Sequence, residues 1–242
     1  MKKIITITAF LIAVISFPGM TQEMNIDTLL SRYYKTVGMA TIKDWKTMIM
    51  KGKTTSQGME LPVTIYMKRP GKIRVEVEIQ GNKMLQVLDG QTGWSVIPWS
   101  GTTDPQDMTP DELKGMKQQA DFEGSLCNWK EKGHKLEFIG KEDMDGTQVY
   151  KLKAMLANEN TETYYFDAES FVPIKVSSVM KIQGNETESE SLPSNYKSVD
   201  GAMMPFAIEN KYKGQTVSNL VIETYEVNKV VDDNLFIKPA KK

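Results

Sequence analysis

Most of the chain beyond residue 45 consists of short segments in which apolar and polar residues alternate. Residues 73–79 read IRVEVEI, and residues 63–67 read VTIYM. Successive side chains of a β-strand point to opposite faces, so this two-residue period predicts strands with one apolar and one polar face. The alternation recurs along the chain with turn-forming residues between the segments. An antiparallel, mainly β protein is therefore expected.

Twelve segments fit this pattern, separated by Gly, Asn, Asp and Pro. They are Lys46–Thr54, Pro62–Lys68, Lys72–Gln80, Lys83–Asp89, Thr92–Pro98, Lys135–Gly140, Thr147–Met155, Thr161–Asp167, Pro173–Ile182, Glu186–Val199, Ala202–Lys213 and Thr216–Asn228. Several connections are only two or three residues long, and tight turns of this kind favour a meander of neighbouring antiparallel strands.

Helical spacing appears in two places. Apolar residues recur every three or four positions over Thr28–Val37, with Asp27 as the expected N-cap and Gly38 as the stop. The second helix is expected over Thr109–Asp121, because a threonine, a proline and two acids form a strong helix start. We also expect a short helical piece over Phe122–Trp129 and, at the end of the chain, a turn over Asp232–Pro239 that places Leu235 and Phe236 inward.

About twelve strands are too many for a barrel whose interior is filled by its own side chains. The sequence therefore predicts a half-open antiparallel β-barrel of about 11–12 strands, with helices covering its concave face and a hydrophobic cavity beneath them. The 16 methionines fit an adaptable apolar site, since the thioether side chain repacks around ligands of different shape. The residues expected to line the cavity are Met48, Met50, Ile65, Met67, Ile73, Val75, Val77, Trp94, Leu113 and Met116.

The first 22 residues resemble a signal peptide. Lys2 and Lys3 precede an apolar run over Ile4–Phe17, which is short for a membrane span, and Pro18 breaks it. An uncleaved anchor is the alternative interpretation. We expect cleavage near Gln22, a periplasmic location, and a single domain over residues 23–242.

Composition narrows the possible chemistry. Thirty basic and 31 acidic residues leave a net charge of −1, which does not indicate a nucleic-acid-binding protein. The single cysteine, Cys127, and the single histidine, His134, are too few for a zinc cluster of Cys and His ligands. A Cys–His dyad is arithmetically possible, but a packed cysteine and a histidine in a turn are the simpler interpretation. No metal, cofactor or catalytic residue is predicted.

Two motifs carry a family resemblance. Residues 67–74 read MKRPGKIR, and residues 89–94 read DGQTGW, followed by Pro98. Together with DFEG at residues 121–124 and DDNLF at residues 232–236, they resemble the LolA-like outer-membrane lipoprotein-sorting and lipoprotein carrier family over essentially the whole mature chain. The resemblance implies a half-open β-barrel capped by helices and the shuttling of acylated proteins through the periplasm.

One site residue follows from this resemblance. Arg69 matches the arginine of the Lys-Arg-Pro turn, which in the carriers lies under a helical lid and couples lid closure to loading and release. A guanidinium can bond helix carbonyls while its stem packs on apolar surface. The alternative is an arginine in an ordinary solvent-exposed turn. The chain departs from the carriers in its greater length, its loops, and Lys72 and Ile73 after the turn, which leaves the cargo open.

The leading functional hypothesis is a non-enzymatic periplasmic carrier that binds the acyl chains of lipoproteins or other lipids for transfer toward the outer membrane. We expect it to act as a monomer, to exchange cargo with an inner-membrane donor and an outer-membrane acceptor, and not to bind nucleic acid. A sensor or interaction module that binds lipidated ligands without transport is the alternative. An enzyme is a third hypothesis, for which Asp121, Glu123 and Asp167 supply acids without a matching nucleophile or base.

Overall fold

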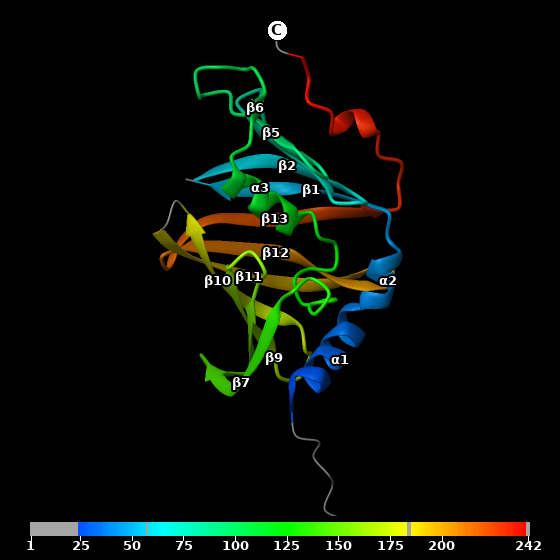
Figure 1. Ribbon diagram of the computed structural model, residues 1–242, viewed down its shortest axis with the longest axis vertical. Helices are drawn as coiled ribbons and strands as arrows, with labels where there is room; N and C mark the ends of the chain where they lie inside the picture. The colour runs from blue at the N-terminus through cyan, green and yellow to red at the C-terminus, as the bar shows by residue number, and fades with distance from the viewer. Residues whose placement is uncertain (1–23, 57, 183–184, 241–242) are drawn as a thin grey trace, which may run out of the picture.

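The computed structural model describes residues 24–56, 58–182 and 185–240. The signal peptide predicted for residues 1–22 lies outside the described residues. The described chain is mainly β, and its strands form one 13-stranded antiparallel sheet. The sheet curves but does not close into a barrel, because its edge strands, β6 and β7, do not pair with each other (Figure 1). The predicted half-open antiparallel architecture is confirmed.

The strands agree closely with the alternating segments of the sequence. Their bounds are β1 (Thr47–Ser56), β2 (Met59–Lys68), β3 (Lys72–Ile79), β4 (Asn82–Asp89), β5 (Gly93–Val96), β6 (Gln106–Asp107), β7 (Lys135–Met144), β8 (Thr147–Met155), β9 (Thr161–Asp167), β10 (Pro173–Ile182), β11 (Asn185–Val199), β12 (Ala202–Tyr212) and β13 (Gln215–Val227). The two-residue strand β6 was not predicted, because so short a segment has no measurable period.

The chain builds the sheet as two meanders. Strands β1 to β6 extend to one edge and β7 to β13 return from the other, so that β1 pairs with β13 in the middle. Residues 108–134, which we call the crossover segment, connect β6 to β7 and therefore pass from one edge of the sheet to the other. In Figure 1 its helix lies in front of the sheet.

The first helical region divides into two helices. Helix α1 (Ile26–Val37) is capped by the side chain of Asn25, which accepts from the Thr28 amide at 2.9 Å; the predicted cap, Asp27, lies inside the first turn. Gly38 adopts the left-handed conformation and ends α1, as predicted. A Cβ at Gly38 would lie 2.5 Å from the Gly201 carbonyl oxygen, so glycine also permits close packing on the β11–β12 turn. Helix α2 (Met39–Asp44) follows directly and was not predicted.

Helix α3 (Pro110–Gln119) begins as the sequence predicted. The Thr109 side chain accepts from the Glu112 amide, and the Glu112 carboxylate accepts from the Thr109 amide, which completes a capping box. The helix predicted over Phe122–Trp129 is wrong, since this part of the crossover segment is a series of turns. Gly124 and Asn128 both have positive φ values, which a continuous α-helix does not allow.

Three hydrophobic clusters hold the layers together. Two lie on the concave face, where α1, α2 and the crossover segment cover the sheet; one contains Met48 and Met67, and the other contains Leu152 and Phe166. The third lies on the opposite face of β1, β4 and β5, where the 3₁₀ helix η1 (Asp233–Leu235) and the buried Phe236 cover Trp94. The predicted inward turn at the C-terminus is therefore present, but on the convex face. Among the described residues, no helix is long and apolar enough to cross a membrane.

Candidate functional site

The side chain of Arg69 lies at the junction of three segments of the chain. It follows directly after β2, and its backbone amide donates to the Lys46 carbonyl at 3.0 Å, which fixes the turn beside the start of β1. Its guanidinium donates from Nε to the Trp45 carbonyl at 2.6 Å and from Nη2 to the Ile42 carbonyl at 3.2 Å. Both carbonyls belong to the C-terminal end of α2, where the last carbonyls lack the usual helical partner four residues on; the Ile42 carbonyl also accepts from the Trp45 amide at 3.2 Å. Arg69 therefore ties the β2–β3 turn to this helix.

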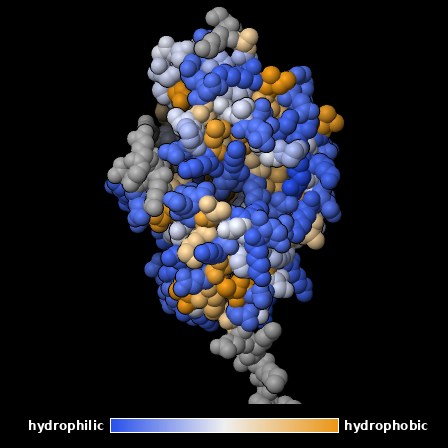
Figure 2. All heavy atoms as spheres, viewed as in Figure 1, coloured by the Kyte–Doolittle hydropathy of each residue, from blue (hydrophilic) through white to orange (hydrophobic). Residues whose placement is uncertain are grey.

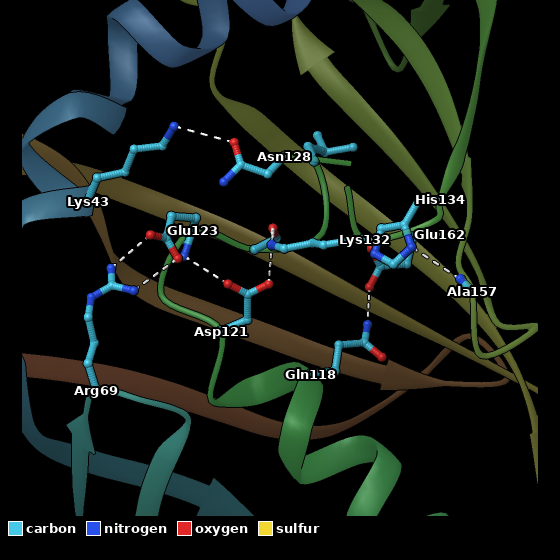
Figure 3. Close-up of polar contacts among 12 residues, drawn as sticks. Lys43, Arg69, Gln118, Asp121, Glu123, Asn128, Lys132, His134, Ala157 and Glu162 are labelled. Carbon is cyan, nitrogen blue, oxygen red and sulfur yellow. Dashed lines mark hydrogen bonds and ion pairs between the residues drawn. The ribbon is translucent and has the colours of Figure 1, made fainter. Parts of the chain in front are cut away.

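The same guanidinium reaches the crossover segment. Nη2 and Nη1 donate to the two carboxylate oxygens of Glu123 at 2.9 and 3.3 Å, as Figure 3 shows. The ring of Phe122 lies 4.5 Å from the guanidinium carbon and adds a cation–π contact. The side chains are mostly shielded, with 27% of Arg69 and 16% of Glu123 exposed. This is the bidentate geometry in which arginine binds a carboxylate most strongly.

A second ion pair holds the turn that carries Glu123. Lys132 donates from Nζ to the Asp121 carboxylate and to the Gly124 carbonyl, and the Glu123 amide donates to Asp121 at 3.2 Å (Figure 3). Burial favours a higher pKa for Glu123, but the hydrogen bonds and the charge of Arg69 outweigh it and lower the pKa. Residues 121–124 (DFEG) thus form a polar turn held by hydrogen bonds, and Arg69 binds Glu123, one of its two acids.

A cleft of about 710 Å³ opens beside these ion pairs. Its walls come from the β2–β3 turn, α3, the turn after α3, and the β8–β9 connection. The lining residues are Arg69, Pro70, Gly71, Lys114, Lys117, Gln118, Ala120, Asp121, Phe122, Glu123, Ser125, Lys132, His134, Leu156, Ala157 and Asn158. Polar side chains dominate this face of the molecule, and Figure 2 shows a hollow near its centre.

Most of the residues predicted to line a cavity come together on the concave face. Met48, Met67, Ile73 and Met116 are buried in one cluster, and Met50, Ile65, Val75 and Leu113 pack against it. Val77 is buried on β3, two residues beyond Val75. None of the ten lines the 710 Å³ cleft. In this closed arrangement the apolar side chains contact one another and the crossover segment, because exposing them to water would be unfavourable.

Trp94 is the exception and requires a correction. It pairs with Val87 across β4 and β5, and both side chains lie in the convex-face cluster. The indole nitrogen donates to the Phe236 carbonyl at 3.1 Å, and only 3% of the residue is exposed. In strand β5 the concave positions belong to Gly93 and Ser95, so alternation places the tryptophan on the other side.

The remaining candidate residues from the sequence make packing contacts or stabilise turns. Cys127 is buried in a core cluster, and the His134 ring accepts at Nδ1 from the Ala157 amide at 3.1 Å. Asp167 accepts from the Ser170 amide and hydroxyl at 2.7 and 2.6 Å, so it caps the turn after β9. In the described part of the chain, no group of three or more His, Cys, Asp or Glu residues could hold a metal ion.

Sequence reasoning missed Gln118, Lys132 and Glu162, and Glu162 is the most buried of these three polar residues. Glu162, the second residue of β9, is 5% exposed, and its carboxylate accepts from the Gln118 side chain of α3 and from the Tyr164 hydroxyl at 2.6 Å. The sequence TETYYF around it alternates, and the register alone would have placed Glu162 on the same face as Tyr164 and Phe166. The available signal was an acid in the same alternating row as two aromatic residues.

Comparison with known proteins supports the fold. No protein-family model and no curated protein matches the chain. In structure, it is similar to a LolA superfamily protein from Nitrosomonas europaea, with 16% identity, a TM-score of 0.60, and coverage of 87% of this chain and 97% of that one. A putative outer membrane lipoprotein-sorting protein domain from Vibrio parahaemolyticus is 13% identical, with a TM-score of 0.60 and coverage of 88% of this chain and 97% of that one. A DUF1329 family protein from Desulfovibrio piger is 12% identical, with a TM-score of 0.57 and coverage of 86% of this chain and 97% of that one. The fold is therefore LolA-like.

Proposed function

We propose that this protein is a periplasmic carrier that binds the acyl chains of lipoproteins or other lipids on its concave face and transfers them toward the outer membrane. The observation that carries the proposal is the continuous apolar surface of β1, β2 and β3, which helix α3 of the crossover segment covers with few buried side chains. Met116 is the only residue of α3 that is buried. A cover of this kind can move aside and expose methionines and branched residues to a ligand.

The energetics explain why such a carrier needs a cover. Burying an acyl chain gains roughly 0.8 kcal/mol per CH₂ group, so two or three long chains would bind too tightly to be released. A cover that competes with the cargo for the same apolar surface lowers the net affinity. In this proposal, the Arg69–Glu123 pair stabilises the covered state and thereby favours release.

The proposal includes the cellular context expected from the sequence. Residues 1–22 direct export, and the mature protein acts as a monomer between an inner-membrane donor and an outer-membrane acceptor. The name of one structural neighbour, a putative outer membrane lipoprotein-sorting protein domain, supports an acylated cargo. The mechanism involves no chemical step and no cofactor.

The test measures binding and transfer together. A fluorescent acylated peptide is mixed with the mature protein, and its transfer to liposomes is followed by the change in fluorescence. We expect saturable binding and transfer at a rate that depends on protein concentration. Native mass spectrometry of protein purified from its own envelope should show co-purifying lipid. Absence of saturable binding, together with a lipid-free mass spectrum, would contradict the proposal.

A further inference from the structure

The concave face has two chemically different halves. On β1, β2 and β3, its positions are Met48, Met50, Ile65, Met67, Ile73 and Val75, all of them apolar. On β9 to β12, the face that carries Tyr164 and Phe166 also carries polar residues. Residues directly opposite each other in antiparallel strands share a face. The register therefore extends this face from Glu162 to Ser178 on β10 and Ser189 on β11.

A neighbouring row of the same face is polar as well. Ser191 on β11 lies opposite Asn210 on β12, and Asn210 lies opposite Ser218 on β13. The Ser191 hydroxyl donates to the Asn210 side chain at 2.8 Å, and the Asn210 amide donates to the Ser218 hydroxyl at 3.2 Å. The concave face is thus apolar on β1 to β3, whereas on β9 to β13 hydrogen-bonding groups lie among its apolar residues.

Glu162 is the most buried member of this polar half. It is 5% exposed, and no ion pair involving it is found among the residues described. Its two partners are neutral donors, Gln118 and Tyr164. Burial raises the pKa of the Tyr164 hydroxyl well above its ordinary value, so this group remains a donor. Gln118, in contrast, belongs to α3, and Figure 3 shows its carboxamide pointing from the helix to the strand.

Movement of α3 would remove Gln118 from Glu162. A buried acceptor that loses its partner costs free energy, unless another donor takes the same place. We infer that Glu162 and Tyr164 form a subsite for the hydrogen-bond-donating head of an amphiphile, such as an amide N–H next to an acyl chain, and that the Gln118 carboxamide occupies this subsite in the closed protein. The chain then lies over β1 to β3. The inference rests on the proposed carrier function and specifies which amphiphile it prefers and how it is oriented.

Two fluorescent probes of equal chain length test the subsite. One joins its chain through an amide with a free N–H, and the other joins it through an ester that lacks this donor. The wild-type protein is expected to bind the amide about tenfold more tightly or better, because only the amide replaces Gln118. In Glu162→Leu this preference should disappear.

A second variant tests the occupant without altering the buried acid. Gln118→Met removes the competing donor, so the affinity for both probes should rise by a similar factor while the preference for the amide remains. Gln119→Met is the matched control, since Gln119 is an exposed neighbour on the same helix, and it should change neither affinity.

The outcomes separate this inference from the proposed function. If the wild-type protein binds neither probe, the carrier function itself fails. If it binds both with equal affinity, or if Glu162→Leu keeps the preference for the amide, the carrier function stands and the subsite is overturned. If Gln118→Met binds both probes as the wild type does, Gln118 does not occupy the subsite, which also overturns the inference.

Discussion

Glu123 and Arg69 are 54 residues apart in the sequence and meet through two hydrogen bonds, at 2.9 and 3.3 Å. Glu123 belongs to the crossover segment and Arg69 to the turn between β2 and β3. The pair therefore joins the cover of the concave face to the sheet beneath it. Since Arg69 also bonds the end of α2, one side chain connects all three parts.

Replacing Arg69 should affect both stability and transfer. Arg69→Leu leaves Glu123 without its partner, and we expect a loss of about 1–3 kcal/mol in the free energy of unfolding, measured with urea. In the transfer assay, cargo should load but leave more slowly, because the covered state is less favoured. Arg69→Lys should be intermediate, since lysine keeps the charge without the two-pronged geometry.

Lys51→Leu is a suitable control for this experiment. Lys51 pairs with Glu226 on the exposed surface, where an ion pair contributes little. We expect its unfolding free energy to stay within about 0.5 kcal/mol of wild type and its transfer rate to be unchanged. A transfer rate for Arg69→Leu equal to that of wild type would show that Arg69 is only a structural residue.

The Arg69–Glu123 pair should also respond to pH. The pKa of Glu123 in the folded protein is lowered from its ordinary value of 4.5, so the folded state binds this proton less readily than the unfolded state. The corresponding stabilisation is fully present above that value and is lost as the pH falls through the lower, folded-state pKa. The difference in unfolding free energy between wild type and Glu123→Gln should therefore shrink in acid. A difference that is constant between pH 7 and pH 3 would contradict this assignment.

Hydrogen exchange should distinguish a movable cover from a static plug. The amides of α3 are expected to exchange faster than those of β3, because α3 buries only Met116 whereas β3 pairs with strands on both sides. Gln118→Met should speed exchange in α3 further and leave β3 unchanged. Equal protection of the two elements would show that the crossover segment opens only when the whole protein unfolds.

Substitution of Gly52 tests the close approach of β1 and β13, the strands that join the two meanders. A Cβ at this position would lie 2.0 Å from the Val221 carbonyl oxygen, so Gly52→Ala must push the strands apart. We expect a loss of about 3 kcal/mol or more in the free energy of unfolding. Gly115→Ala in α3 is the control: its Cβ meets open space, and alanine favours a helix, so stability should rise slightly. If Gly52→Ala is as stable as wild type, the close approach of the two strands is not essential.

The sequence alone determined most of the strands, the C-terminal end of α1 and the start of α3, because these depend on local interactions. Alternation defines which residues share a face, and the cap of α3 needs only Thr109 and Glu112 within one turn. Local pattern could not decide which face of β5 is concave, since Trp94 alternates equally well in either register. It also overestimated the helix at Phe122–Trp129, where Gly124 and Asn128 turn the chain.

The tertiary structure decided what these elements bring together. Only the pairing of β1 with β13 and the passage of residues 108–134 across the concave face place Glu123 against Arg69 and Gln118 against Glu162. A two-residue period is a property of neighbouring side chains and solvent, and it contains no information on segments 40 or more residues away. The apolar face was therefore evident from the sequence, whereas its cover and the polar groups that hold it follow from the fold.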